Sequence, residues 1–405
     1  MRILKINAQE EAKSLMQKIG VDPYGIKIML PKAVSYAVLL NDISSISANI
    51  LKQEMLSLGG DAAVARGVLT GKLKRSNCLV FGTLSQLGRL AEKLKAQPFG
   101  LKVQAALLQG SINCYQNDRS TMKLGPFKLG LGKRTRIMAI MNLTPDSFSG
   151  DGLYRLLAKK DLPAILGIAQ KLVAEGADIL DIGGESTRPG AIFVSAKEEI
   201  NRVKPVIKLL AKKIKVPISI DTYKPEVAQV ALDEGALLVN DISGLRCAKM
   251  RRLASAAKVA VVIVHMRGAS PKVMQKNIHY RSLLDQVISG LSMAVRKAEE
   301  DGVDPKKIII DPGIGFGKLA EHNLEMLNHL DEFKILGKPV MVGVSRKAFI
   351  RKITGNAPAE LISGTLAASV LAVVKGAQIV RVHDLKAVRD GLKVADAIMR
   401  KNQYA

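Results

Sequence analysis

From about Arg136 onward, short apolar runs alternate with longer amphipathic stretches along the chain. The short runs are rich in Val and Ile and almost free of polar residues, which is typical of strands buried on both faces. We predict strands at 136–142, 178–183, 217–221, 237–241, 260–265, 307–311, 339–344 and 377–382. Helical periodicity occupies the intervals, for example at 164–177, 197–214, 361–377 and 384–400.

Eight strands, each followed by a helix, predict a (β/α)₈ TIM barrel of the α/β class. A doubly wound open sheet is the competing architecture. It would be expected to carry a GxGxxG loop after its first strand, and the sequence has none there. The polar clusters of this region follow the ends of the predicted strands, which in a barrel form the catalytic face.

The first third of the chain has a different pattern. Apolar runs at 1–6, 25–30, 35–40 and 77–82 predict strands, and periodic segments at 9–19, 45–58 and 85–95 predict helices. Ser45 or Ser47 is a candidate N-cap for the second of these helices. We therefore predict a small α+β domain at 1–125 with no assigned role, a Gly-, Pro- and Lys-rich linker at 126–135, and the barrel at 136–405.

Two polar segments follow the first two predicted barrel strands. Asn142 ends the first strand and would point into the barrel mouth, although a strand-end Asn is also a common turn residue. Residues 183–191, GGESTRPGA, place two glycines, a carboxylate, two hydroxyls and a guanidinium close together. Backbone N–H groups, hydroxyls and an arginine in one loop favour binding of an anion.

Carboxylates and an amide end three further strands. Asp221, Asn240 with Asp241, and Asp311 each close an apolar run, where a carboxylate is partly desolvated and needs a partner. Structural ion pairs could supply those partners. A heteroaromatic ring with adjacent N–H donors could also do so, and Asn240 with the aspartates suits a 2-amino-4-oxo pyrimidine edge.

The last strands carry a glycine-rich loop and a basic rim. The segment DPGIGFGK (311–318) is a weak nucleotide motif, and we interpret it as a flexible loop that holds Phe316 and Lys318 over a ligand. His265 ends the fifth strand and could be structural or functional. The seventh and eighth strands end in a basic group that favours phosphate, formed by Ser345, Arg346, Lys347, Arg381 and His383.

Composition narrows the class of protein. The net charge of the 405 residues is +25, but the basic residues are spread over both predicted domains and aromatic residues make up only 4%. This argues against a nucleic-acid binder and favours either a generally basic cytosolic proteome or anionic small substrates that the field attracts. No apolar run is long enough to predict a membrane span, and the N-terminus does not resemble a secretory signal. Cys78, Cys114 and Cys247 fit neither a disulfide framework nor a zinc site, so we expect a cytoplasmic protein.

Taken together, these motifs resemble those of the dihydropteroate synthases, a family of pterin-binding enzymes. The resemblance covers about two-thirds of the chain, with the motifs in the family's order. It rests on NLTPDSFSGDG (142–152), GGESTRPGA (183–191), SIDTYKPEVA (219–228), VNDISG (239–244), DPGIGFGK (311–318), GVSRKAF (343–349) and RVHD (381–384). The first segment departs from the family pattern, because it reads SFSGDG where the family more often has SFSDGG.

The resemblance implies condensation of 6-hydroxymethyl-7,8-dihydropterin diphosphate with 4-aminobenzoate in folate biosynthesis. It implies that Asp221, Asn240, Asp311 and Lys347 hold the pterin. It also implies that Asn142, Arg381 and His383 hold the diphosphate and Mg²⁺, with Asn142 the metal ligand, and that Thr187, Arg188, Pro189, Phe316 and Ser345 surround the aminobenzoate. Lys347, Arg381 and His383 are the implied catalytic residues, and a homodimer through barrel helices is the implied assembly.

Two alternatives remain open on the sequence. A methyltetrahydrofolate–corrinoid methyltransferase resembles the same barrel and shares the pterin-reading carboxylates, but it has no diphosphate to bind, which would leave the basic rim without a purpose. A non-catalytic, basic RNA-binding scaffold is the second alternative. The first 130 residues do not show the signatures of the pyrophosphokinase that is sometimes fused to this family, so we do not predict a bifunctional enzyme.

Overall fold

The structure is a computed structural model of the whole chain. It describes residues 1–6, 8–116, 121–145, 153–186, 191–268, 270–357 and 360–399. The chain divides into two compact units, residues 1–117 and 118–405. Each unit is described by itself below.

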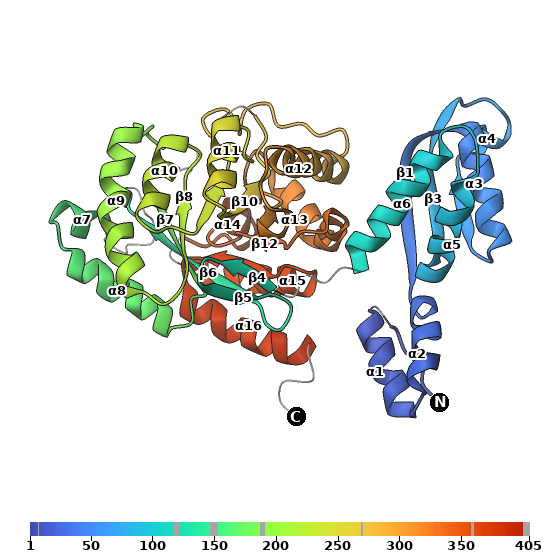
Figure 1. Cartoon of the computed structure of the whole chain (residues 1–405), viewed down its shortest axis with the longest axis horizontal. Helices are drawn as coiled ribbons and strands as arrows, with labels where there is room; N and C mark the ends of the chain where they lie inside the picture. Colours follow the sequence, from blue (N-terminus) through green and yellow to red (C-terminus); the bar gives the residue numbers. More distant parts are fainter. Residues whose placement is uncertain are drawn as a thin grey trace. The chain divides into compact units, whose positions relative to one another are not determined.

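The N-terminal unit is a three-stranded antiparallel sheet with helices packed on one of its faces (Figure 1). Its strands pair in the order β1-β3-β2, and alternate strand residues such as Val80 lie in one core with Leu51 of α3 and Leu90 of α5. Its elements are α1 (Gln9–Ile19), α2 (Pro23–Met29), the short 3₁₀ helix η1 (Leu30–Lys32), β1 (Ser35–Ser44), α3 (Ser45–Ser57), β2 (Asp61–Val64), α4 (Arg66–Leu69), β3 (Arg75–Thr83), α5 (Leu84–Leu94) and α6 (Leu101–Gln116).

Several predictions for this unit were wrong in detail. Residues 25–30, which we predicted to be a strand, belong mostly to α2, because the Asp22 carboxylate accepts a hydrogen bond from the Tyr24 N–H at 2.8 Å and Pro23 opens the helix. Residues 1–6 form no strand. The N-cap of α3 is Ser44, whose hydroxyl accepts from the Ser47 N–H at 3.1 Å, and not Ser45 or Ser47.

The second unit is a closed barrel of eight parallel strands, and all eight predicted strands are confirmed. The strands pair in the order β11-β10-β9-β8-β7-β6-β13-β12, and a parallel bridge between Ile310 and Val340 closes the ring. The strands are β6 (Arg136–Asn142), β7 (Ile179–Gly183), β8 (Ile218–Asp221), β9 (Leu238–Asp241), β10 (Ala260–Val264), β11 (Ile308–Asp311), β12 (Met341–Val342) and β13 (Ile379–Val382).

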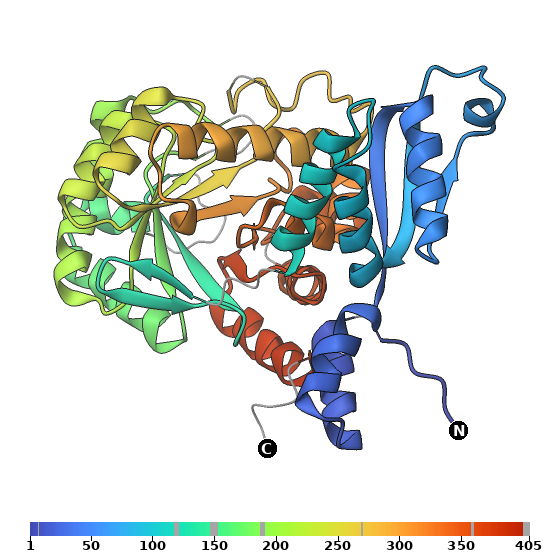
Figure 2. The ribbon, with the colours of Figure 1, turned by 45° about the vertical axis from the view of Figure 1, so that its right-hand side comes forward.

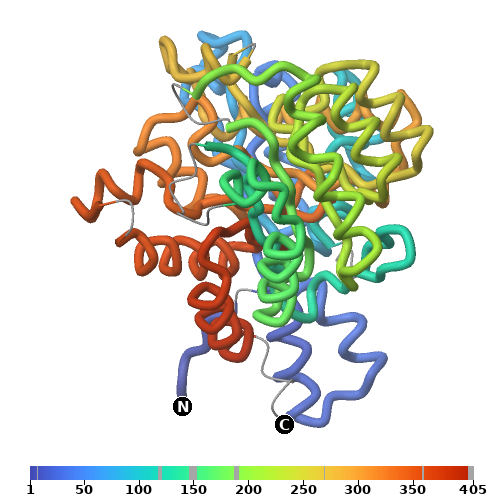
Figure 3. The backbone as a smooth tube through the Cα atoms, turned by 90° about the vertical axis from the view of Figure 1, so that its left-hand side faces the viewer, coloured from blue at the N-terminus to red at the C-terminus, as the bar shows by residue number. Residues whose placement is uncertain are grey.

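Helices surround the barrel. In Figure 3 the last helix, α16 (red), lies beside α8 (green), where Arg389 Nη1 donates to the Glu175 carbonyl at 2.7 Å. The surrounding helices are α7 (Leu153–Ala158), α8 (Leu162–Ala174), α9 (Ala196–Lys213), α10 (Pro225–Asp233), α11 (Ala248–Ala256), α12 (Leu283–Glu300), α13 (Ala320–Asn328), α14 (Ala348–Thr354), α15 (Ile362–Val374) and α16 (Leu385–Met399), with 3₁₀ turns η2 (Pro305–Lys307) and η3 (Leu330–Leu336). Among the described residues, no helix combines the length and apolarity that a membrane crossing needs.

A β-hairpin closes the N-terminal end of the barrel (Figure 2). Its strands are β4 (Thr121–Leu124) and β5 (Phe127–Gly130), and it packs near Leu237, which directly precedes β9. Residues 126–135, for which the sequence suggested a linker, therefore contain a strand instead. Leu129 and Leu131 are buried against apolar residues of the barrel interior, so this Gly- and Pro-rich segment has the composition of a linker but forms the floor of the barrel.

Candidate active site

The carboxyl ends of the barrel strands surround a cavity of about 750 Å³. Residues from most of the barrel strands line it, including Asn142, Asp221, Asn240, Asp311 and Arg381. This is the end of the barrel at which the fold places active sites. The predicted polar clusters therefore meet in one space.

Strand register places polar side chains in the upper part of the barrel interior. Asp181 lies opposite Ser219 in the β7–β8 pair, and Asp221 lies opposite Asn240 in the β8–β9 pair. All of them are at most one-ninth exposed. Asp181 and Ser219 were not predicted as site residues, because they lie inside apolar strands. Alternation could have identified Asp181, since it lies two residues before Gly183 and therefore faces the same side of β7.

Arg381 links two of these carboxylates. Its Nε lies 2.6 Å from Asp181 Oδ2, and its Nη2 lies 2.6 Å from Asp221 Oδ2. Asn240 Nδ2 also donates to Asp181 Oδ2, at 3.0 Å. Burial raises the pKa of Asp221 to about 7, although the Arg381 charge acts in the opposite direction. Arg381 therefore compensates a buried negative pair and lines the cavity.

Several buried oxygen atoms in this layer have no hydrogen-bond partner among the described residues. They are Asp181 Oδ1, Ser219 Oγ, Asp221 Oδ1 and Asn240 Oδ1. Unsatisfied buried polar atoms are rare because each costs free energy. Asp221 and Asn240 line the cavity, and their unpartnered oxygens indicate a ligand that supplies hydrogen-bond donors.

Asp311 approaches the cavity from β11. Its Oδ1 accepts from the Gly313 N–H at 2.7 Å, and burial raises its pKa to about 6. The chain after it turns through Gly313, Gly315 and Gly317, all with positive φ, a conformation that glycine adopts without strain. This turn brings the Phe316 ring within 4.4 Å of Lys347 Nζ.

Lys318 lies on the predicted loop and lines the cavity. Its ammonium is nevertheless buried and lies 3.0 Å from His265 Nδ1. His265 is half-buried and contacts Lys318, and desolvation lowers its pKa far below the usual value. These contacts favour the structural alternative for this histidine.

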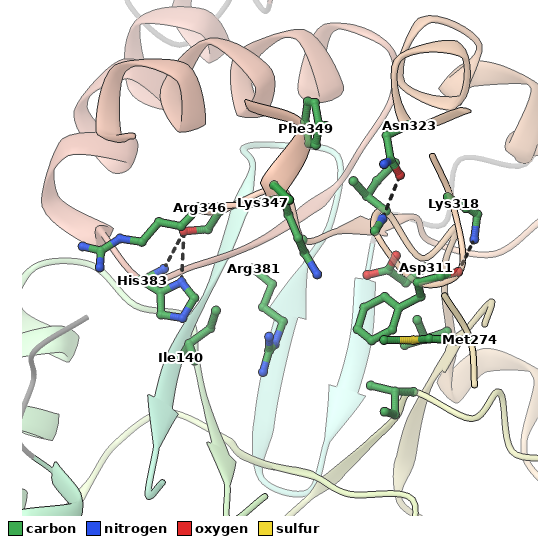
Figure 4. Close-up of a pocket in the computed structure, with 18 of the residues that line it drawn as sticks. Ile140, Met274, Asp311, Lys318, Asn323, Arg346, Lys347, Phe349, Arg381 and His383 are labelled. Carbon is green, nitrogen blue, oxygen red and sulfur yellow. Dashed lines mark hydrogen bonds between the residues drawn. The ribbon is translucent and has the colours of Figure 1, made fainter. Parts of the chain in front are cut away.

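The basic rim is partly as predicted. Figure 4 shows Lys347 and Arg381 reaching into the same space, with His383 beside them. His383 Nδ1 lies 3.1 Å from Ser345 Oγ. Arg346 instead pairs with Asp384, with 2.9 Å between Nε and Oδ2, at φ +55°. Its charge is therefore directed to a neighbouring carboxylate.

The segment after β7 is described only in part. Thr187, Arg188 and Pro189 lie outside the described residues, so their predicted roles are not located. The residues beside them form a buried ion cluster in which Lys224 Nζ lies 2.8 Å from Glu185 Oε2 and 2.6 Å from Glu199 Oε2. No role was predicted for this lysine from the sequence.

The metal prediction rests on Asn142. Its side chain is half-buried at the end of β6 and lines the cavity. The described residues contain no group of three or more His, Cys, Asp or Glu side chains that could hold a metal ion by themselves. One amide oxygen suits Mg²⁺ that arrives with a diphosphate, because Mg²⁺ takes most of its ligands from water and phosphate.

Comparison with known proteins agrees with this geometry. Residues 138–383 match the family model described as pterin binding enzyme. A Synechocystis dihydropteroate synthase is 46% identical over 271 residues, 66% of this chain and 92% of that protein. A Halobacterium salinarum protein named as a probable bifunctional folylpolyglutamate synthase/dihydropteroate synthase is 37% identical over 97% of this chain, which spans 46% of that protein. A solved Thermus thermophilus dihydropteroate synthase in complex with 4-aminobenzoate has 42% identity, a TM-score of 0.61, and coverage of 69% of this chain and 99% of that one.

Proposed function

The chain belongs to the pterin-binding enzyme family, with dihydropteroate synthase function, and from this premise we propose which of its residues perform the reaction. The substrates are 6-hydroxymethyl-7,8-dihydropterin diphosphate and 4-aminobenzoate, and the products are 7,8-dihydropteroate and diphosphate. One observation carries the proposal. A buried layer of unpartnered acceptors lies beside a basic rim in a single cavity, which suits a ligand with a donor-rich ring and an anionic tail.

Side chains from β8, β9 and β11 form hydrogen bonds with the pterin ring of the substrate. Asp221 and Asp311 accept hydrogen bonds from ring N–H and amino groups, and Asn240 both donates and accepts along another edge. Lys347 donates to a ring acceptor. The raised pKa values of Asp221 and Asp311 support these roles, because a carboxylate that burial leaves undersolvated gains most from new donors.

Arg381 lies between the pterin and diphosphate ends of this site. Its Nη2 contacts only Oδ2 of Asp221, so Oδ1 of that carboxylate can accept a hydrogen bond from the pterin amino group. Its Nε contacts Asp181, which holds the guanidinium beside the diphosphate.

The diphosphate lies at the ends of β6, β12 and β13. Arg381 and His383 donate to its oxygens, and Asn142 supplies one ligand to the Mg²⁺ that the diphosphate brings. The metal ion, when bound, stabilises negative charge on the leaving diphosphate. Its role and its identity are proposals that the donor set supports.

The aminobenzoate approaches along Phe316 and Ser345, with Thr187, Arg188 and Pro189 completing its surroundings. The amine of an aniline is neutral and nucleophilic at pH 7, so the reaction needs no strong general base. The barrier lies in breaking the CH₂–O bond, and Arg381 and His383 lower it by stabilising the diphosphate as its charge develops. The buried carboxylates stabilise a cation-like methylene, so the displacement is dissociative.

A product assay tests this function. Purified protein with pterin diphosphate, Mg²⁺ and radiolabelled 4-aminobenzoate should form labelled dihydropteroate. Lys347→Ala and Arg381→Ala should each lower kcat/KM by about 10²–10³-fold, whereas Arg296→Ala, a change of an exposed arginine on α12, should leave it unaltered. Wild-type protein that binds the pterin but forms no product would contradict the assignment.

We also propose a homodimer through α15 and α16. The two helices pack against each other and carry solvent-exposed apolar side chains, among them Leu371, Val374, Val394 and Ile398. Such a patch on neighbouring helices favours association of like surfaces. Sedimentation should give a dimer for the wild type and a monomer for the double variant Leu371→Glu, Ile398→Glu.

We also propose a cytoplasmic location, which the free state of all three cysteines supports.

A further inference from the structure

A buried lysine lies at the edge of the candidate active site, outside the roles assigned above. Lys318 is only 4% exposed. Its Nζ lies 3.0 Å from His265 Nδ1, 3.1 Å from the Phe316 carbonyl oxygen and 3.3 Å from the His265 carbonyl oxygen. These three acceptors match the three donors of an ammonium group.

The acceptors belong to two different loops. His265 begins the β10–α12 loop, and Phe316 lies in the β11–α13 loop. Two further hydrogen bonds join the same loops: Gln275 Nε2 donates to the Gly315 carbonyl at 2.7 Å, and the Tyr280 hydroxyl donates to the Gly317 carbonyl at 3.0 Å. Backbone packing is equally close, because a Cβ on Gly313 would lie 1.9 Å from the His265 oxygen. The two loops therefore form one unit, and Lys318 adds two charge-assisted bonds between them, both to His265.

The unit fixes the place of Phe316. Lys318 holds the carbonyl of Phe316, and the ring of the same residue stacks under Lys347 Nζ at 4.4 Å. Figure 4 shows Lys318 at the edge of the cavity, on the opposite side of Asp311 from Lys347 and Arg381. A ligand in the cavity would therefore meet Phe316 and Lys347 while Lys318 stays bound to its carbonyl partners.

We propose that Lys318 is a positioning residue, which holds the Phe316 ring against Lys347 and thereby shapes the aminobenzoate site without touching either substrate. This inference rests on the proposed function, which gives Phe316 the aminobenzoate. The pterin site depends less on the two loops, since Asp221 and Asn240 extend from the ends of β8 and β9 and only Asp311 contacts the β11–α13 loop, through Gly313. Loss of the ammonium should therefore affect one substrate more than the other.

The first test is a comparison of the two substrates in Lys318→Met, a variant that keeps the volume and removes the donors. We expect the KM for 4-aminobenzoate to rise about tenfold, as loss of charge-assisted hydrogen bonds predicts. The dissociation constant of the pterin diphosphate, measured by calorimetry, should change less than about threefold by comparison. An unchanged KM for aminobenzoate, or a loss confined to the pterin diphosphate, would overturn the inference.

The second test is the pH profile of kcat/KM for aminobenzoate. Burial lowers the pKa of Lys318 to about 7, with Lys347 acting in the same direction and Asp311 opposing it; His265 faces the ammonium from β10 with its neutral ring, and Arg246 lies near that ring. The charged form that makes the three bonds is lost as pH rises through this pKa, so the wild-type profile should fall above about pH 7. Lys318→Arg keeps the donors and cannot lose its proton in this range, so the fall should disappear. The same fall in Lys318→Arg would assign the titration to another group and overturn the inference.

Tyr280→Phe keeps the inference testable if Lys318→Met does not fold. This variant removes one neutral hydrogen bond from the same pair of loops, and the KM for aminobenzoate should rise about threefold. No change in that KM would count against the loops as a positioning unit. Wild-type protein that makes no dihydropteroate would instead defeat the proposed function, so the two failures can be told apart.

Discussion

The same strands form both the floor of the barrel, which the hairpin closes, and its mouth at the carboxyl ends of the strands. Along one strand, inward-facing residues two positions apart change from apolar to polar. Ile179 precedes Asp181, Leu238 precedes Asn240, Ile309 precedes Asp311, and Ile379 precedes Arg381. The first member of each pair is buried with the apolar hairpin at the floor. Asn240, Asp311 and Arg381 line the cavity, and Asp181 lies directly beneath it in contact with Arg381. One step of the strand period therefore separates a packed core from a polar site.

The two ends differ in what they contribute. The floor removes apolar surface from water and stabilises the fold. The mouth holds buried carboxylates whose pKa values are raised and oxygens that lack partners, so it costs stability until a ligand arrives. We infer that the mouth is maintained for binding and that the floor compensates for it.

Arg381→Ala should have the largest effect, because it alters both roles of the mouth. Dihydropteroate formation should fall about 10³-fold, since the diphosphate loses its cation. The free energy of unfolding at pH 7 should also fall by about 3–5 kcal/mol, because Asp181 and Asp221 lose the guanidinium that lies 2.6 Å from each. Product assays and urea titrations measure the two effects, with Arg296→Ala as the matched control. Unchanged stability would show that the carboxylates do not depend on this pair.

Ile309→Ala, a change at the floor, should lower the stability of the fold and leave the activity nearly unchanged. Ile309 is fully buried in the floor, and truncation should lower the free energy of unfolding by about 2–5 kcal/mol. The kcat/KM of the folded variant at low temperature should stay near the wild-type value, since no cavity-lining atom is removed. Ile353→Ala, at a position that is 60% exposed, is the control. A large loss of activity in folded Ile309→Ala would mean that the floor also shapes the site.

The floor and the mouth were not equally predictable from the sequence. Runs such as 136–142 matched their strands because burial on both faces leaves a nearly continuous apolar signal. The hairpin was mistaken for a linker, since Gly125 and Pro126 look the same in a turn and in a loose connection. The strand-end residue Asp221 was identified because it interrupts an apolar run at its boundary.

Other residues of the mouth could not be assigned because tertiary partners decide their roles. Asp181 lies within a strand, and only the register against Ser219 and the contact with Arg381 reveal its position. Lys318 follows a glycine-rich run that predicts a mobile loop, yet its bonds to a neighbouring strand end bury it. The sequence places Arg346 in a basic rim, but in the structure its guanidinium forms an ion pair with Asp384, which is distant in sequence.

Asp221→Asn should remove the pH-dependent destabilisation that this buried carboxylate causes at the mouth of the barrel. The folded-state pKa of Asp221 is about 7, above its ordinary value, so its contribution to stability is present below about pH 4 and is lost as pH rises through 7. The free energy of unfolding of the wild type should therefore fall, relative to that of the variant, by on the order of 2 kcal/mol as the pH rises from 5 to 8. Urea titrations of both ligand-free proteins at a series of pH values measure it. A pH-independent difference would mean that this carboxylate is ionised throughout the range.

Deletion of residues 1–117 should have the smallest effect on the reaction, because the floor and the mouth both belong to the second unit. The cavity-lining residues and the hairpin all lie beyond residue 120, and the N-terminal unit has a separate apolar core. The Synechocystis relative matches only 66% of this chain over 92% of its own length, so a synthase can lack most of a counterpart to this unit. Assayed alone, residues 118–405 should retain kcat/KM within about twofold, as expected for a domain with its own core. A loss of kcat/KM of more than about tenfold, with an intact thermal transition, would show that the first unit helps to shape the active-site cavity.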